Sequence, residues 1–340
     1  MTSETRQVRL ANRPMGMPDE ATWSLATEEL PSITEGQLLV KVDYISIDPA
    51  MRGWLNDVRS YLPPVQIGEV MRSLDIATVV GSAHPDFAVG DVVSGMFGVT
   101  QYAVCDGADA QKVDVATAPA PTWLGTLGIP GMTAYFGLLD VGKLKAGETV
   151  VVSAAAGAVG SAVGQIAKAR GATVVGIAGG PDKCRMLTDE LGFDAAVDYR
   201  NENVLRRLRE VVPDGMDVYF DNVGGDTLDA ALANLRHGAR VVICGGISAY
   251  NEEKLPPGPS RYMSLLVFRA SMTGFVVFDY AERYAEATEQ ISAWLADGLM
   301  QAREQIVEGG VEKFGECLNM LFTGAGTGTG TGTGKLILAV

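Results

Sequence analysis

The sequence has few of the residues from which metal sites and disulfide frameworks are built. Only 2 histidines and 4 cysteines occur among its 340 residues. The cysteines show no paired spacing, so a disulfide framework is not predicted and a reducing cytoplasm fits: they are Cys105, Cys184, Cys244 and Cys317. A zinc site needs Cys, His and acidic ligands at fixed places, and the chain offers no such set. We therefore predict that the protein binds no metal.

Positive charge and long apolar runs are also scarce. The 27 Lys and Arg residues, against 41 Asp and Glu residues, give a formal net charge of -14. This balance disfavours a general nucleic-acid or anionic-membrane surface, so a phosphate site must be built locally. No run reaches the ~18 apolar residues of a membrane-spanning helix, and the first residues, MTSETRQVRL, lack the apolar segment of a secretion signal. We expect a cytoplasmic protein without a nucleic-acid or membrane partner.

The length suggests about two domains, and the strand pattern differs between the two parts of the chain. Residues 1–125 contain short strands joined by Gly, Pro and Asp turns, which predicts a small, partly closed β-barrel; the strands are expected at 37–46, 76–80, 91–95 and 101–104. From Glu148 onward, strands alternate with helices, which predicts an α/β fold with a doubly wound parallel sheet. Its strands are expected at 148–154, 172–178, 194–199, 216–222, 239–245 and 272–278, with helices at 202–212 and 226–236 among the connections.

The end of the chain suggests how the domains are completed. A clear amphipathic helix is expected at 280–297, with Ile291, Trp294 and Leu295 on one side. The terminal strand at 335–340 has no obvious place in a six-stranded parallel sheet. We therefore expect a second domain at 126–299, and a first domain at 1–125 that residues from about 300–340 complete.

The stretch from Val150 to Gly171 is central to the interpretation. A β-branched run meets an Ala/Gly turn, a helix follows to Arg170, and a second buried strand begins after Gly171. This is a βαβ unit of the dinucleotide-binding (Rossmann) kind in which alanine replaces the usual first glycine. Gly157 would let the backbone approach a pyrophosphate, and Gly160 would let the helix pack closely on the strand. The helix N-terminus would offer its N–H groups to the phosphates.

The end of the second strand favours NADP over NAD. An NAD site usually has an Asp or Glu there for the ribose 2′-hydroxyl, whereas this strand ends in Ala178-Gly179-Gly180. Lys183 can supply a counter-charge to a 2′-phosphate, and Tyr199 and Arg200 lie nearby in this topology. The alternatives are that Asp182 serves an NAD ribose, or that Lys183 is a solvated residue at the start of the next helix.

Two other patterns are interpreted as accidental. Tyr250 and Lys254 match the Tyr-x-x-x-Lys pair of short-chain dehydrogenases, but they lie beside a Pro-rich loop, 255–259, rather than on a helix. The run from Gly324 to Lys335 suggests a phosphate-binding loop, yet Thr329 takes the first glycine position and Leu336 the Ser/Thr position. A flexible low-complexity hairpin explains this run better.

Seven strings spread over nearly the whole chain carry a family resemblance. They are DPAMRG at 48–53, PPVQIGE at 63–69, GMTAYFGL at 131–138, AAAGAVGSAVG at 154–164, FDNVGG at 220–225, CGGISAYN at 244–251 and FVVF at 275–278. The chain resembles the zinc-independent medium-chain dehydrogenase/reductases, within them the alkenal/enone double-bond reductases of the prostaglandin reductase, leukotriene hydroxydehydrogenase and curcumin reductase type. The resemblance implies an NADPH-dependent reductase of α,β-unsaturated carbonyls. Its GroES-like first domain and its Rossmann domain would hold substrate and cofactor in the cleft between them.

The resemblance also implies roles for individual residues. The pyrophosphate would lie at Gly157, Ala158, Val159 and Gly160, and the 2′-phosphate at Lys183 and Tyr199. The adenosine and nicotinamide would be lined by Asn222, by Cys244, Gly245, Gly246, Ile247, Ser248 and Tyr250, and by Phe275, Val276, Val277 and Phe278. The substrate pocket would involve Ala50, Tyr61 and Met132. The sequence departs from the family pattern at two positions. The family usually has Tyr at the position of Ala50, and it has an Asn at the position that Gly332 occupies in the Thr-Gly repeat at 326–334. A homodimer through the edge strand 274–278 is also implied.

Tyr250 looks like the active-site tyrosine. Hydride transfer to the β-carbon of an enone leaves negative charge on the carbonyl oxygen, and a neutral phenol can stabilise it, since phenols have an ordinary pKa of about 10. The alternative is that Tyr250 only packs over the nicotinamide, and Tyr61 could equally be structural. At the level of function, the alternatives are an NADPH:quinone reductase and a non-catalytic NADPH-binding protein.

Overall fold

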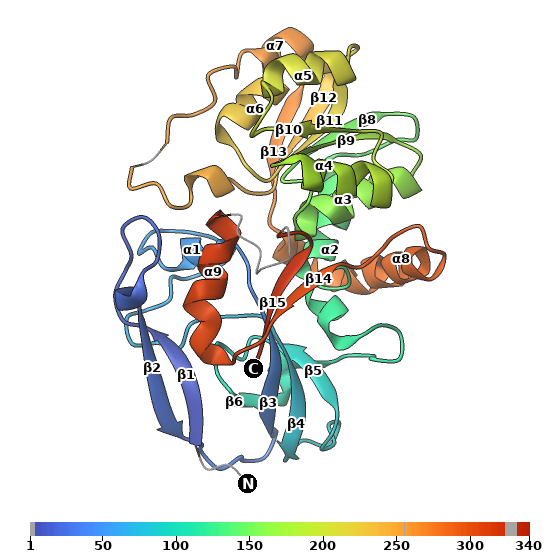
Figure 1. The fold of residues 1–340 in the computed structure, drawn as a ribbon. Helices are drawn as coiled ribbons and strands as arrows, with labels where there is room; N and C mark the ends of the chain where they lie inside the picture. Colours follow the sequence, from blue (N-terminus) through green and yellow to red (C-terminus); the bar gives the residue numbers. More distant parts are fainter. Residues whose placement is uncertain (1–3, 255, 324–331) are drawn as a thin grey trace. The chain divides into compact units, whose positions relative to one another are not determined.

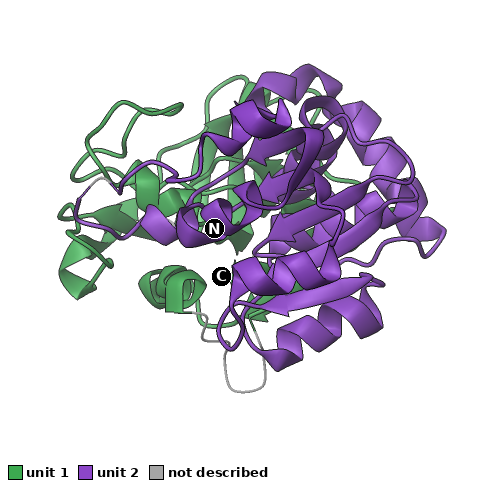
Figure 2. Ribbon diagram, turned by 90° about the horizontal axis from the view of Figure 1, so that it is seen from above, with its two compact units in different colours: residues 1–124, 304–340 green, residues 125–303 purple. Residues whose placement is uncertain are grey.

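A computed structural model describes residues 4–254, 256–323 and 332–340. The chain divides into two compact units (Figure 2): unit 1 comprises Met1–Leu124 and Glu304–Val340, and unit 2 comprises Gly125–Arg303. Most of the Thr-Gly run, for which a hairpin is predicted, lies outside the described residues, as does Leu255 of the Pro-rich loop.

Unit 2 is built on a parallel sheet (Figure 1). In the described residues its six strands follow the order β10 (Ala195–Asp198), β9 (Thr173–Ala178), β8 (Thr149–Ser153), β11 (Met216–Asp221), β12 (Leu235–Ile243) and β13 (Ser271–Gly274). Every neighbouring pair is parallel, which confirms the predicted doubly wound sheet. The strand order reverses between β8 and β11, and ligands of such sheets bind outside the carboxyl ends of the strands at this switch point.

Helices cover both faces of this sheet (Figure 1). They are α3 (Ala158–Ala169), α4 (Pro181–Arg185), α5 (Val204–Val211), α6 (Gly225–Leu232) and α7 (Ser264–Phe268), and the unit also contains α2 (Ile129–Phe136) and α8 (Tyr284–Ala296). Helix α3 packs on α2, and α2 on α8, while α5 packs on α6. The amphipathic face predicted for α8 is confirmed, because Ile291 and Trp294 are buried and Leu295 is half-buried.

Four predicted boundaries in unit 2 are wrong. The strand predicted at 239–245 begins at Leu235, and the α-helix predicted at 280–297 begins at Tyr284. The helix predicted at 226–236 ends at Leu232, because the Asn234 side chain donates to Ala230 O at 2.7 Å and Leu235 already pairs with Met216 of β11. The strand predicted at 272–278 ends at Gly274. Phe275 instead joins an aromatic cluster, with ring centroids 6.4 Å from those of Phe220 and Tyr280, and a 3-10 helix follows at Val277–Arg283.

Unit 1 contains a mixed sheet. Its described strands follow the order β14 (Glu304–Val307), β15 (Lys335–Ala339), β3 (Gln37–Ser46), β4 (Asp75–Ser82), β5 (Val92–Gly95) and β7 (Ala110–Lys112), and β6 (Tyr102–Asp106) also pairs with β3. A separate hairpin is formed by β1 (Glu4–Leu10) and β2 (Trp23–Glu29). The C-terminal strand β15 thus lies beside β3 in antiparallel register.

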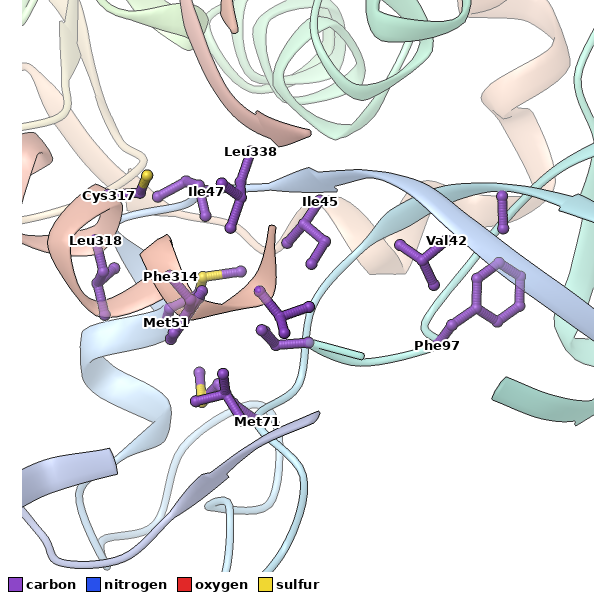
Figure 3. Packing of buried hydrophobic residues seen from close by; sticks show 14 of the residues in the cluster. Val42, Ile45, Ile47, Met51, Met71, Phe97, Phe314, Cys317, Leu318 and Leu338 are labelled. Carbon is purple, nitrogen blue, oxygen red and sulfur yellow. The ribbon is translucent and has the colours of Figure 1, made fainter. Parts of the chain in front are cut away.

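The core of unit 1 explains why its short strands hold together. Alternate residues of β3 (Leu38, Val40 and Val42) are fully buried, as expected for a strand with one face on the core. The core also receives side chains from α1 (Ala50–Trp54) and α9 (Phe314–Thr323), and Figure 3 shows Met51, Phe314 and Leu318 within it.

Candidate functional site

A tight turn at the switch point connects β8 to α3. Ala154 has φ 48, a left-handed conformation that is uncommon for a residue with a side chain and often marks a functional turn. Gly157 is the N-cap residue, and its N–H donates to Ala154 O at 3.0 Å. The first N–H groups of the twelve-residue helix α3 have no carbonyl partner within the helix. This end of α3 can therefore bind an anionic group.

Glycine occurs at positions 157 and 160 of this turn for different structural reasons. A Cβ on Gly160 would lie 2.3 Å from Ala154 O and 2.8 Å from Ala155 Cα, so the turn and the helix can approach only through glycine here. A Cβ on Gly157 would meet only Ala154 O, at 3.3 Å. The fold itself thus requires Gly160, as the sequence indicated, whereas Gly157 leaves space beside the helix terminus.

Two cations gather at the carboxyl end of β9. Burial lowers the pKa of Lys183, and the nearby Arg200 guanidinium lowers it further. In the described part of the chain, no carboxylate forms an ion pair with Lys183 Nζ or with the Arg200 guanidinium, and Asp182 pairs with Arg185 instead. A Cβ on Gly179 would lie 2.8 Å from the Tyr199 hydroxyl and 2.9 Å from Arg200 Nε, so Tyr199 and Arg200 both lie against this strand end. Lys183 and Arg200 can bind a dianion together.

Asp198 stabilises the backbone at the same strand end, and within the described residues it forms no ion pair with Lys183 or Arg200. Its carboxylate accepts from Gly180 N at 2.7 Å, from Arg200 N at 3.0 Å and from Asn201 Nδ2 at 2.7 Å. These hydrogen bonds outweigh partial burial and lower the pKa of Asp198. The acid therefore holds the turn that carries Arg200.

Asp221 organises the ends of β8 and β11, a role that the sequence analysis missed. It is 1% exposed, and its Oδ1 accepts from Ser153 Oγ at 2.9 Å, Tyr219 Oη at 3.0 Å and Val223 N at 3.1 Å. Beside it, Asn222 Nδ2 donates to Ser153 O at 2.7 Å. An acid at the end of a mostly apolar strand was the available signal, but its main partner lies 68 residues away.

The loop after β12 is attached to this polar cluster. The N–H groups of Cys244 and Gly245 donate to Asp221 O, and Ser248 Oγ donates to Val223 O at 2.6 Å. Tyr250 is half-buried, and its hydroxyl accepts from Gly246 N at 3.3 Å. The loop thus holds a phenol at the carboxyl edge of the sheet.

Comparisons with known proteins follow the same division of the chain. Residues 6–113 match the family model described as the N-terminal domain of oxidoreductase, and residues 158–293 match the one described as zinc-binding dehydrogenase. The NADPH-dependent curcumin reductase of Escherichia coli is 42% identical over 306 residues, which cover 88% of each chain. Prostaglandin reductase 1 of Bos taurus is 39% identical over 302 residues, covering 87% of this chain and 89% of the bovine one.

The chain belongs to the medium-chain dehydrogenase/reductases, in the branch of the enone double-bond reductases. The crystal structure of CurA from Vibrio vulnificus in complex with NADPH agrees with this family. It is 40% identical, covers 98% of this chain and 99% of its own, and superposes with a TM-score of 0.92. The α/β fold with a Rossmann sheet and a GroES-like β-rich unit is the family fold.

Although a name in this dehydrogenase family refers to zinc, the described residues contain no group of three His, Cys, Asp or Glu side chains that could hold a metal ion. The two histidines are far apart in the sequence. His84 Nδ1 accepts from Asp86 N within its own turn, and His237 is exposed. The burial of Cys244, near Asp221, raises the pKa of its thiol to about 12.

The remaining residues of the predicted site are distributed over both units of this reductase. Ala50, half-buried at the start of α1, and Tyr61, 52% exposed, belong to unit 1. Met132, 2% exposed, lies in α2 of unit 2. Phe275 packs in the aromatic cluster, and Val277 O accepts from Tyr284 Oη at 3.0 Å. Ligand contacts for these residues stay predictions.

Proposed function

We propose that this protein uses NADPH to reduce the carbon–carbon double bond of α,β-unsaturated ketones and aldehydes, by hydride transfer to the β-carbon. One observation carries the proposal: a pair of cations and a positioned phenol lie at the same carboxyl edge of one parallel sheet. The names of the related curcumin and prostaglandin reductases support it.

The residues at this edge fit NADPH. The open space at Gly157, with Ala158, Val159 and Gly160 at the helix terminus, suits a pyrophosphate. Lys183 and Arg200, together with Tyr199, suit a 2′-phosphate, because neither cation pairs with a carboxylate of the described residues and two such cations favour a dianion. The adenosine and nicotinamide are assigned to Asn222, to Cys244–Ser248 with Tyr250, and to Phe275–Val277. When bound, NADPH supplies the hydride.

Tyr250 is assigned the role of hydrogen-bond donor to the carbonyl oxygen of the substrate. A phenolic oxygen can accept one hydrogen bond and donate another, so the N–H of Gly246 can orient the hydroxyl while its proton stabilises the developing enolate. Unit 1 is assigned a substrate-binding role through Ala50 and Tyr61. In unit 2, Met132 is assigned to substrate as well.

The rival activity, quinone reduction, is tested by comparing initial rates. NADPH and NADH consumption are measured in parallel with 3-nonen-2-one and with 1,4-naphthoquinone. The proposal expects fast NADPH oxidation with the enone and slow oxidation of NADH. A preference for the quinone would assign the protein to the quinone reductases, and tight NADPH binding without turnover on either substrate would make it a non-catalytic binding protein.

The two turn glycines give a matched pair of variants. Gly160→Ala places a methyl group against the backbone of Ala154 and Ala155, so we expect a Tm several degrees lower and an NADPH Kd at least about tenfold higher. Gly157→Ala meets only one atom of the fold, at 3.3 Å, so we expect a much smaller fall in Tm with a similar loss of NADPH affinity. Differential scanning fluorimetry and fluorescence titration measure both. Unchanged NADPH affinity in Gly157→Ala would contradict the pyrophosphate assignment.

We further propose that the protein is a cytoplasmic homodimer joined at β13. In the described residues β13 pairs only with β12, and all four of its residues are exposed. The neighbouring segment that includes α7 exposes Tyr262, Met263, Leu266 and Val267 by 50–67%. An unpaired edge beside exposed apolar side chains suits a second copy of the same edge. Light scattering should give twice the 35.9 kDa chain mass, falling to one chain in Leu266→Glu. A wild-type monomer would contradict this arrangement.

The four cysteines are free thiols, which agrees with the cytoplasmic assignment. In the described part of the chain, no helix combines the length and the apolar character that crossing a bilayer requires.

A further inference from the structure

Lys335 is a buried cation of unit 1 that the proposed function does not use. It is 2% exposed, and its ammonium donates to Ile47 O at 2.8 Å and to Asp48 Oδ1 at 2.6 Å. The Ser46 hydroxyl donates to the other oxygen of the same carboxylate. Removing a charge from water is costly, and apolar replacements of buried ion pairs are often as stable as the pair itself. The free energy of folding alone therefore does not explain why an ion pair lies at this position.

The ion pair holds the segment that leads into α1. Lys335 is the first residue of β15, and Ile47 N donates to Leu336 O at 3.1 Å, so the end of β3 is attached to β15 at two neighbouring points. Asp48 O then accepts from Met51 N at 3.0 Å in the first turn of α1. Lys335 thus fixes the backbone immediately before Ala50.

A second buried cation holds α1 from its middle residue. Arg52 is 3% exposed, and its guanidinium donates to Gly16 O at 2.9–3.0 Å, to Pro14 O at 3.2 Å and to Asn56 Oδ1 at 2.8 Å. Arg13 Nη1 donates to Leu55 O at 2.6 Å. Helix α1 is therefore joined to the loops on either side, and we refer to residues 13–18 and 50–69 together as the α1 platform.

The α1 platform exposes large apolar side chains around a helix that is held at both ends. The exposed fractions are 76% for Met15, 60% for Val58, 52% for Tyr61 and 62% for Ile67. Exposed apolar side chains beside a firmly held helix can serve to bind an apolar ligand. Methionine and tyrosine adapt well to apolar ligands of varied shape. The apolar chain of an enone has the chemistry that this surface would bind.

We propose that Lys335 is a positioning residue for substrate: through Asp48 it sets the place of the α1 platform, which binds the apolar chain of the enone. This inference rests on the proposed function and adds a residue that determines preference for longer substrates. Lys335 does not touch the reacting atoms in this proposal. Its effect is confined to the Michaelis constant for substrates that are long enough to contact the platform.

The test compares two variants of the full-length protein. Lys335→Met keeps an unbranched side chain but leaves the Asp48 carboxylate without its cation, so the Tm is expected to fall by several degrees. The double variant Asp48→Asn/Lys335→Met removes both charges, and its Tm should return close to that of the wild type. For each, KM and kcat are measured with 3-nonen-2-one and with the short enone 3-buten-2-one, and NADPH Kd is measured by fluorescence titration.

A matched control separates positioning from loss of stability. Ile76 is 1% exposed in β4 of the same unit, and among the described residues it packs in a cluster without members of the α1 platform, so Ile76→Ala should lower the Tm comparably through a cavity without touching the ion pair. Its KM values are expected to remain those of the wild type.

The proposal expects the KM for 3-nonen-2-one to rise at least about fivefold in both Lys335 variants, although the Tm of the double variant recovers. The KM for 3-buten-2-one and the NADPH Kd should change less than twofold. It is overturned if the KM for the long enone recovers together with the Tm, or does not rise at all, or if both enones are affected equally. A wild-type protein that reduces neither enone would refute the proposed function itself.

Discussion

Replacing Tyr250 by phenylalanine is expected to lower kcat for an enone at least about tenfold and to leave the NADPH Kd unchanged. The substitution removes one oxygen atom from a ring that the loop after β12 holds in place, since Gly246 N donates to that oxygen at 3.3 Å. Loss of a hydrogen-bond donor to a developing oxyanion removes an interaction that is strongest in the transition state, so kcat and kcat/KM should fall together. Single-turnover and steady-state kinetics with 3-nonen-2-one measure both quantities.

Tyr262→Phe provides the control for this experiment. Tyr262 lies in the same unit, in the segment assigned to the dimer contact and not to cofactor or substrate, so removing its hydroxyl should alter neither turnover nor cofactor affinity. If Tyr250→Phe turned over as fast as the wild type, Tyr250 would serve only as a packing residue and the donor role would have to be given up.

Removing the cations at the carboxyl end of β9 is expected to have the largest effect on cofactor choice. Lys183→Ala and Arg200→Ala should each raise the KM for NADPH by about ten- to a hundredfold, because a hydrogen bond to a charged group contributes about 1.5–3 kcal/mol. NADH lacks the 2′-phosphate, so its KM should change less than twofold. The double variant should therefore prefer NADH or show no preference.

Lys168 is a suitable control for the loss of positive charge. It lies in α3 of the same unit but forms its ion pair with Asp194 at 2.9 Å. Lys168→Ala should leave both cofactor constants as they are in the wild type. Equal losses for NADPH and NADH in the Lys183 and Arg200 variants would indicate that these residues support the fold of the strand end rather than a phosphate.

Much of unit 2 could be predicted from its sequence because the decisive signals there are local. The buried strands, the glycine turn and the helix cap at Gly171, with φ 77, all follow from neighbouring residues. The boundaries after α6 and β13 could not be predicted in this way. Leu235 enters a strand because Met216 pairs with it, and Phe275 leaves one because Phe220 and Tyr280 receive its ring.

The polar residues that shape the site were harder to predict, because their partners are distant in the sequence. Asp221 depends on Ser153, and Lys335 on Asp48, 287 residues away. A buried acid or lysine in an apolar strand signals that a partner exists, but the sequence alone does not say which one. The need for glycine at 157 is hard to predict for another reason. Any residue can adopt its backbone conformation (φ -81), and the space beside it is explained only by a bound ligand.

The most direct test of the central claim is the position of the transferred hydride in the product. The wild-type protein is supplied with NADPH deuterated at the reactive C4 position and with 3-nonen-2-one, and the product is analysed by NMR and mass spectrometry. We predict 2-nonanone with one deuterium at the β-carbon. An allylic alcohol with deuterium on the carbinol carbon would contradict the claim, because it would show reduction of the carbonyl group rather than of the double bond.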